Sequence, residues 1–168
     1  MGTTIKDRQI FRDMNILVSG MGNLGVSKTV ESPKIEFMTN ERDGAIAIEE
    51  VIPLLKPMSM KLTLNEYNKE VYAAVGKQFR ETPTFFAKNS TVQGGSNIQV
   101  LITAKGKVKV LEDKIPDRGK EVEQTLEISI EAYSLEIGGV KKVDIDFKNM
   151  IAIIDGVDYY QELRAHIQ

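Results

Sequence analysis

A glycine-rich segment near the N-terminus is the pattern that most directly suggests ligand chemistry. Gly20 to Gly25 (GMGNLG) matches the G-x-G-x-x-G pattern of dinucleotide-binding sites and follows a short apolar stretch. Such a site needs a helix directly after the glycines, because the N-terminus of that helix meets the pyrophosphate. Val26 to Val30 is instead rich in β-branched residues and soon reaches Ser32-Pro33, where a helix is disfavoured. We therefore interpret the segment as a glycine-rich β-turn, and a nucleotide-dependent oxidoreductase is the least favoured function.

Residues that bind metals or act as nucleophiles are scarce. The chain has no cysteine and one histidine, His166, which excludes a thiolate zinc site, a multi-histidine site and a cysteine nucleophile. Asp144 and Asp146 would share one face of a strand, but two carboxylates without a third ligand bind Mg²⁺ weakly. No serine, threonine or lysine lies in a nucleophile motif. We expect neither enzymatic activity nor any metal, nucleotide or covalent cofactor.

A stripe of lysines with a spacing of two is the strongest charge pattern. It consists of Lys105, Lys107 and Lys109. The expected partner strand carries Glu123, Glu127 and Glu131 on its matching face. Cross-strand pairs of opposite charge stabilise a sheet by roughly 0.2–1 kcal/mol each. Because no aromatic side chain is interleaved for base stacking, we favour a charge-compensated polar face over a nucleic-acid site.

Length and composition indicate one globular domain, residues 1–168, with an N-terminal arm at residues 1–13. The chain has 168 residues, 42% of them hydrophobic, with 22 Lys and Arg against 24 Asp and Glu. A net charge of -2 lacks the basic excess of a dedicated nucleic-acid-binding protein. The longest aliphatic run, Met150–Ile154, is far too short to cross a bilayer, and the first fourteen residues lack an apolar signal region. We expect synthesis in the cytoplasm and no membrane insertion.

Two hairpins are predicted from alternating apolar and polar residues. The short one pairs Lys34–Thr39 with Ala45–Glu50 around the turn Asn40–Gly44, with Ile46 and Ile48 on one apolar face. The long one pairs Asn97–Glu112 with Glu121–Ile137 around the polar loop Asp113–Lys120. Further strands are expected at Asn15–Ser19, Met58–Leu64, Thr84–Thr91, Val140–Asp146 and Met150–Ile154.

Only two helices are expected. Tyr67, Val71, Val75 and Phe79 recur every four residues, which predicts a helix over Glu66–Gln78 with Asn65 as its N-cap. Asp158 with Gln161 suggests a capping box for a short terminal helix. The fold class is therefore mainly β, a sandwich or barrel-like domain with one central helix and a short C-terminal helix.

The order and spacing of several segments resemble one known family. They are Asn15–Gly20, Ser32–Ile35, Asn68–Gly76, Glu136–Gly139, Val143–Asp146, Asn149-Met150 and Gly156–Asp158. This arrangement is similar to the major tail tube protein of contractile-tailed bacteriophages and of the related R-type bacteriocins, over roughly Met14 to His166. Ser19-Gly20 replaces the usual Asp-Gly or Asn-Gly, and Ser32–Ile35 (SPKI) replaces Leu-Pro-Lys-Leu.

The resemblance implies a tail-tube-like structural protein. Its subunits would form six-membered rings that stack into a hollow tube inside a contractile sheath, as a conduit for the genome. Implied partners are further copies of the chain and the sheath, baseplate and tail terminator proteins. The tube would be assembled in the host cytoplasm and belong to the virion. A tube subunit of a bacteriocin or type VI secretion system, or a monomeric β-sandwich binding module, is the alternative.

Two groups of residues are assigned to this expected assembly. If the apolar face of each hairpin packs on its own domain, the polar face is left to line the channel. The channel-facing residues are then Lys105, Lys107, Lys109, Glu123, Glu127, Glu131, Glu36 and Glu49. The hairpin tips would contact other subunits through Asn40, Glu41, Arg42, Asp43, Gly44, Asp113, Lys114, Pro116, Asp117, Arg118 and Gly119. Because the charges on the long hairpin cancel, DNA would pass without specific binding.

Overall fold

The chain is mostly β-strand in a computed structural model that describes residues 5–18, 22–25 and 27–168. The large sheet contains β1 (Ile10–Val18), β2 (Gly22–Gly25), β3 (Ser27–Glu31), β6 (Ser59–Leu64), β7 (Thr84–Gln93), β8 (Ser96–Lys114), β9 (Glu123–Ile137), β10 (Val140–Asp146), β11 (Ile151–Ile154) and β12 (Val157–Asp158). A separate two-stranded sheet contains β4 (Phe37–Arg42) and β5 (Ile48–Leu55). The two helices described are α1 (Lys69–Lys77) and α2 (Gln161–Ile167).

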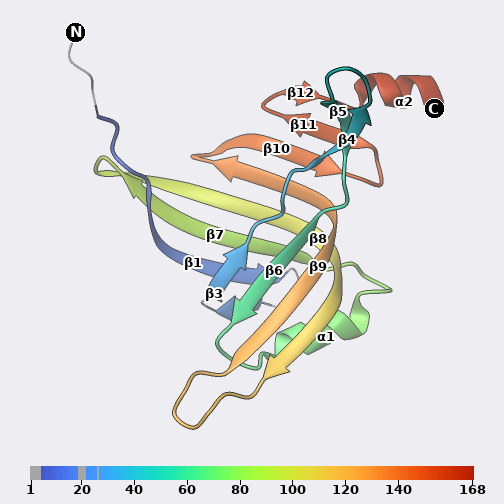
Figure 1. Cartoon of the computed structure of the whole chain (residues 1–168). Helices are drawn as coiled ribbons and strands as arrows, with labels where there is room; N and C mark the ends of the chain where they lie inside the picture. Colours follow the sequence, from blue (N-terminus) through green and yellow to red (C-terminus); the bar gives the residue numbers. More distant parts are fainter. Residues whose placement is uncertain (1–4, 19–21, 26) are drawn as a thin grey trace.

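The large sheet curls into a barrel-like body (Figure 1). Its strand order is β12-β11-β10-β9-β8-β7-β1-β2, with β6 paired to β9 and β3 paired to β6. All of these pairings are antiparallel. The separate sheet, which we call the β4–β5 ribbon, lies with α2 at one end of the molecule, while α1 and the β8–β9 loop lie at the other end. The mainly β fold with two helices confirms the fold class predicted from the sequence.

Strand β9 holds the sheet together because three strands pair with it. One edge pairs with β8 along most of its length. The other edge is shared, since its first half, residues 124–129, pairs with β6 and its second half, residues 132–137, pairs with β10. At the branch point the Ile130 N–H donates to the Met58 carbonyl at 3.0 Å, and the Phe147 N–H donates to the Glu131 carbonyl at 3.0 Å. The branch therefore leaves both of these main-chain groups paired.

Alternation along the strands produces one connected apolar core. On β9, Leu126, Ile128 and Ile130 are buried while their sequence neighbours are more exposed, as the alternating pattern predicts. The core also takes in residues of β1, β6, β7, β8, β10 and β11 and the inner face of α1. Burial of such side chains supplies most of the stability of a domain of this size.

Helix α1 covers the part of β8 that β7 does not reach. Pairing of β7 with β8 ends at Lys105, and beyond it Gln78 takes the place of a strand residue. The Val108 N–H donates to Gln78 Oε1 at 2.8 Å, and Gln78 Nε2 donates to the Val108 carbonyl at 3.2 Å. The Tyr67 hydroxyl donates to the Lys114 carbonyl at 2.6 Å, and the Tyr72 hydroxyl donates to Asp113. The helix thus protects an open sheet edge.

The helix begins later than the four-residue period predicts. It starts at Lys69, and the residue at its N-cap is Asn68, whose side chain accepts from the Glu70 N–H at 2.8 Å, and not Asn65. Of the predicted apolar face Val71 is fully buried, whereas Phe79 lies beyond the helix and is 83% exposed. The period extended past the helix because apolar residues of the flanking turns happen to continue it.

Several other boundaries differ from the prediction. The arm predicted for residues 1–13 overlaps β1, which already begins at Ile10 and pairs with β7. Strand β5 includes Pro53, at a point where the β4–β5 register is irregular and a missing N–H donor is tolerated. Asp158 does not cap α2, whose N-cap position is Tyr160 without a side-chain cap. Ser19, Gly20 and Val26 lie outside the described residues.

Gly106 occupies a site that admits no side chain. A Cβ placed there would lie 2.0 Å from the Ser129 carbonyl oxygen of β9, which is itself held in the sheet. The register of β8 on β9 shifts between Lys105 and Gly106, and this close approach accompanies the shift. A glycine in the middle of a long strand is normally unfavourable, so the close approach explains its presence.

We therefore expect Gly106→Ala to destabilise the subunit by about 3 kcal/mol or more, because β8 and β9 must move apart. Gly76→Ala is the matched control, since a Cβ at Gly76 meets nothing within 4 Å and lies inside α1. The control should gain about 0.5–1 kcal/mol from higher helix propensity. Urea denaturation measures both, and equal stabilities of the two variants would contradict the assignment.

Candidate functional site

The polar face of β8 and β9 carries the predicted lysines and glutamates, and two of the lysines form ion pairs with two of the glutamates. Lys107 Nζ lies 2.8 Å from Glu131 Oε1, and Lys109 Nζ lies 3.2 Å from Glu127 Oε1. Lys105 is opposite Ala132 in the register, and Glu123 is opposite Lys114. The partners differ from a simple ladder because the register shifts twice, at Lys105/Gly106 and at Val108/Val110.

The second register shift also places one apolar residue of β8 on the solvent side of the strand. In an unbroken alternation Val110 would share the apolar face of β8 with Val108. It instead pairs with Glu127 and is 44% exposed, whereas Val108 is 7% exposed. Leu111 pairs with the fully buried Leu126 and packs against the core in its place. A β-bulge of this kind inserts one residue and reverses the alternation beyond it.

Glu131 is the electrostatic centre of this face. Its side chain is 19% exposed and lies between Lys107 and Lys148, with Lys148 Nζ 3.3 Å from Oε2. Hydrogen bonding to Lys107 is the main influence that lowers the pKa of the Glu131 carboxyl, and partial burial opposes it. Lys148 is held in place by a turn in which Asp146 Oδ1 accepts from the N–H groups of Lys148 and Asn149, each at 3.1 Å. Asp146 therefore shapes a turn here.

Further charged residues border the same face. Lys61 of β6 is opposite Glu127 in the register. A groove beside them is lined by Glu31, Ser32, Lys34, Glu36, Pro57, Met58, Ser59, Lys61 and Glu127. Glu36 reaches this groove and pairs with Lys56 at 2.9 Å, which lowers the pKa of its carboxyl through hydrogen bonding. Glu49 lies apart from it, on β5 opposite Glu41.

Apart from its base, where Leu55 is buried and Phe37 packs against the core, the β4–β5 ribbon has no apolar face packed on its own domain, contrary to the prediction for the short hairpin. Ile48 pairs with Arg42 and is 55% exposed, and Val51 pairs with Thr39 and is 68% exposed. These two pairs lie on opposite faces of the ribbon, because the intervening residues alternate. Asn40, Glu41 and Arg42, expected in the turn, are part of β4, while Asp43 and Gly44 follow it. Both faces of the ribbon are thus open to solvent.

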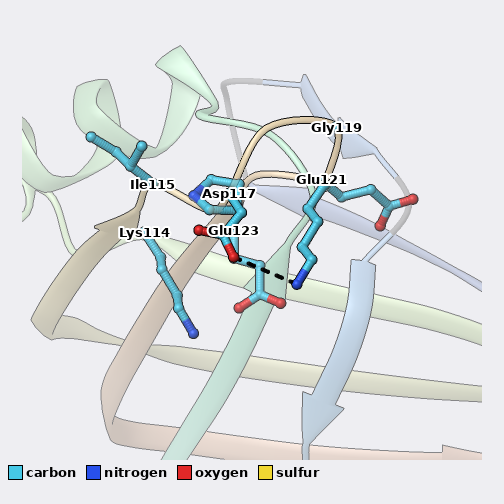
Figure 2. A pocket seen from close by; sticks show the side chains of 8 residues that line it. Lys114, Ile115, Asp117, Gly119, Glu121 and Glu123 are labelled. Atoms are coloured by element: carbon cyan, nitrogen blue, oxygen red, sulfur yellow. Dashed lines mark ion pairs between the residues drawn. The ribbon is translucent and has the colours of Figure 1, made fainter.

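The loop between β8 and β9 has the predicted length but begins and ends two residues later, at residues 115–122. Asp113 and Lys114 belong to β8, and Pro116, Asp117, Arg118 and Gly119 lie in the loop itself. Figure 2 shows the side chains of Lys114, Ile115, Asp117, Glu121 and Glu123 around an open groove, with an ion pair of 3.7 Å between Lys120 and Asp117. Ile115 at its border is 87% exposed. The polar loop tip expected from the sequence therefore also presents one large apolar side chain.

The remaining sequence candidates concern a nucleotide site and a metal site. Gly22–Gly25 is strand β2, paired antiparallel to β1, and residues 27–31 that follow form strand β3, so the described part of the glycine motif has no helix after it. Among the described residues, no three His, Asp or Glu side chains gather to hold a metal ion. None of the helices in this part of the chain is long and apolar enough to cross a membrane.

The barrel-like sheet with its separate ribbon has a fold that is found in contractile injection systems. Its fold is shared by chains of two solved assemblies of an extracellular contractile injection system. The first is the PVC sheath/tube terminator, which has a TM-score of 0.56 and 9% identity and covers 74% of this chain and 93% of that chain. The second is the PVC sheath-tube complex, which has a TM-score of 0.54 and 12% identity and covers 74% of this chain and 88% of that chain.

Residues 8–167 match the family described as phage tail tube protein FII, and the chain belongs to this family. The tail tube protein of Escherichia phage P2 is 26% identical over 163 residues, which cover 92% of this chain and 94% of that protein. The resemblance inferred from the sequence is therefore confirmed. The protein is a structural component of the phage tail, and hence of the virion.

Sequence reasoning missed several residues of the charged face. Lys61 was assigned to a strand, but nothing in the sequence indicated that β6 would lie beside β9 at that register. Lys148 follows no periodic pattern, since it lies in the turn after β10. The one available signal for the position of Lys148 was Asp146 followed by Lys148-Asn149, because an aspartate at this spacing often accepts hydrogen bonds from the main chain of a turn.

We expect Glu131→Gln to reduce stability at pH 7 by about 1–2 kcal/mol, between the values for exposed and buried ion pairs. Because folding lowers the pKa of Glu131, its contribution is complete above the unfolded value of about 4.5 and is lost as the pH falls through the folded value. The difference between wild type and variant should therefore vanish at sufficiently low pH. Urea titrations at several pH values measure it.

Glu127→Gln is the control for this prediction. Its pair with Lys109 is more exposed, at 38% and 48%, so the variant should stay within about 0.5 kcal/mol of wild type. A Glu131→Gln effect no larger than that of Glu127→Gln, or one that persists unchanged in acid, would count against the central role of Glu131.

Proposed function

We propose that the protein forms six-membered rings that stack into the hollow inner tube of a contractile phage tail, a non-enzymatic conduit for the genome. The observation that carries this proposal is the β4–β5 ribbon, which is separate from the large sheet and exposed on both faces. Membership in the phage tail tube family supports it. We propose further that sheath, baseplate and tail terminator proteins contact the tube, which is assembled in the host cytoplasm.

An isolated two-stranded ribbon is at best marginally stable in water. Here Ile46, Ile48 and Val51 are 83%, 55% and 68% exposed, which is costly unless another surface covers them. In a chain that assembles with itself, the covering surface is supplied by a neighbouring copy. The ribbon projects from one end of the molecule (Figure 1). If a different surface of the next copy covers it, the contact is head-to-tail and repeats from copy to copy, as rings and tubes require.

The hairpin tips are proposed as additional contacts between subunits. The ribbon turn at residues 43–47 and the loop at residues 115–122 lie toward opposite ends of the molecule. Ile46 in the first and Ile115 in the second are 83% and 87% exposed. These exposed apolar side chains suit segments that become covered when a second ring is added.

We propose that the polar face of β8 and β9 lines the channel. The six side chains predicted there are joined by Lys61 and Lys148, so five lysines accompany three glutamates. Glu127 and Glu131 hold Lys107, Lys109 and Lys148 in ion pairs, which leaves fewer cations free for phosphates. DNA held by few phosphate contacts can slide, as a conduit requires.

A tube of an R-type bacteriocin or type VI secretion system stays the second candidate. The shared fold with chains of an extracellular contractile injection system favours it, because such a fold serves tubes in more than one kind of particle. Electron microscopy of intact particles separates the two, since a phage tail ends at a DNA-filled capsid and a bacteriocin does not.

Ile48→Asp should abolish tube formation while leaving the subunit folded. The side chain is 55% exposed, so the substitution should change the free energy of unfolding by less than about 0.5 kcal/mol. Negative-stain electron microscopy and size-exclusion chromatography measure assembly. Ile48→Val is the control and should assemble like wild type. Tubes of Ile48→Asp that form as readily as those of wild type would exclude the ribbon from the contact.

Assembled tubes of the double variant Glu127→Gln, Glu131→Gln should retain DNA at low salt and release it as salt rises, because the freed lysines then contact phosphates. Wild-type tubes should not retain DNA. The control is Glu81→Gln with Glu162→Gln, which removes the same charge at two exposed positions near the helices. Equal DNA retention by both double variants would show that this face does not line the channel.

A further inference from the structure

The β4–β5 ribbon is joined to the rest of the molecule through a narrow neck. No strand of the large sheet pairs with it within the described residues. At the neck the Lys56 N–H donates to the Glu36 carbonyl at 2.8 Å, and Lys56 Nζ lies 2.9 Å from Glu36 Oε1. These contacts connect the two ends of the ribbon to each other, so they do not determine the angle between the ribbon and the barrel.

Two consecutive tyrosines from the C-terminal end of the chain contact the two strands of the ribbon. The Leu55 N–H, at the end of β5, donates to the Tyr160 hydroxyl oxygen at 2.9 Å. Both residues are buried, with Leu55 5% and Tyr160 7% exposed, although they are 105 positions apart in sequence. On the other strand, the rings of Phe37 and Tyr159 meet edge to face with centroids 5.4 Å apart. Each strand of the ribbon is therefore held by one tyrosine.

Tyr160 is itself held by an ion pair. The Tyr160 N–H donates to Asp158 Oδ1 at 3.0 Å, and Arg164 Nη2 lies 2.5 Å from Asp158 Oδ2. Arg164 Nη1 also donates to the Met150 carbonyl at 2.6 Å. Side-chain exposure of Arg164 and Asp158 is only 24% and 16%. A continuous set of contacts thus runs from the end of β10–β11 through α2 to the ribbon.

We propose that Tyr160, supported by Tyr159 and the Asp158–Arg164 pair, is a positioning residue that sets the direction in which the ribbon leaves the barrel, and that assembly depends on this direction. The second half of this proposal rests on the proposed function. Without the Tyr160 hydroxyl, the Leu55 N–H has lost its acceptor in a buried site, which favours local opening of the neck. A ribbon with a variable direction must be reordered each time a copy is added, which weakens association.

Tyr160→Phe tests the proposal because it removes only the hydroxyl and keeps the buried ring. Amide hydrogen exchange in the free subunit should become at least about tenfold faster at residues 48–55, with the barrel strands unchanged. Residual dipolar couplings measured by NMR should show one ribbon direction in wild type and averaging in the variant. The critical concentration for tube formation should rise at least about tenfold, equivalent to about 1.4 kcal/mol per contact.

Tyr133→Phe is the matched control. Tyr133 is a buried tyrosine of β9, 4% exposed, and burial raises the pKa of its hydroxyl. Its variant should leave the ribbon couplings and the critical concentration unchanged. Unaltered couplings and exchange in Tyr160→Phe would overturn the positioning role, whatever the assembly result. A loosened ribbon with an unchanged critical concentration would overturn the dependence of assembly on it. Wild-type subunits that never form tubes would instead contradict the proposed function, while the couplings still decide the positioning role.

Discussion

The main-chain edge of β9 is the constraint on which the rest of the structure depends. One edge of this strand is shared by two strands, with β6 on residues 124–129 and β10 on residues 132–137. The branch places Ile130 and Glu131 where the pairing changes, and the Ser129 carbonyl there approaches Gly106 so closely that β8 can carry no side chain at that point. The sheet curls into a barrel on the β6 side and extends toward the C-terminal strands on the β10 side. A change at this branch therefore affects both parts of the molecule.

The branch also decides the charge distribution of the polar face. Glu131 lies at the branch, so it contacts Lys107 of β8 as well as Lys148 from the turn after β10. Glu127 lies between Lys61 of β6 and Lys109 of β8. Each of these two carboxylates thus lies between lysines from two separate parts of the chain. Such partly exposed networks contribute modestly to stability, and their main effect here is on how many lysines remain available to a polyanion.

The same C-terminal extension carries the tyrosines that hold the ribbon. The ribbon is a separate sheet, but the side of the large sheet that continues through β10 and β11 leads to the tyrosines that contact it. The ribbon has no core of its own, and Phe37 and Leu55 at its base are covered by Tyr159 and Tyr160. Its exposed apolar residues are among the surfaces that a single copy leaves uncovered, and they are the observation behind the proposed assembly.

Local patterns in the sequence were sufficient for most strands and for the alternating burial of β9, because a period of two directly reflects which side chains face the core. They also located the lysine and glutamate faces, and the order of segments identified the family. They could not place the β-bulge that exposes Val110, the N-cap at Asn68 or the solvent exposure of Ile48, which depend on what packs against each segment. Only the tertiary structure decided that Lys61, Lys148 and Tyr160 matter, because their partners are brought near by pairing across the shared edge of β9 and by contacts between residues as far as 105 positions apart.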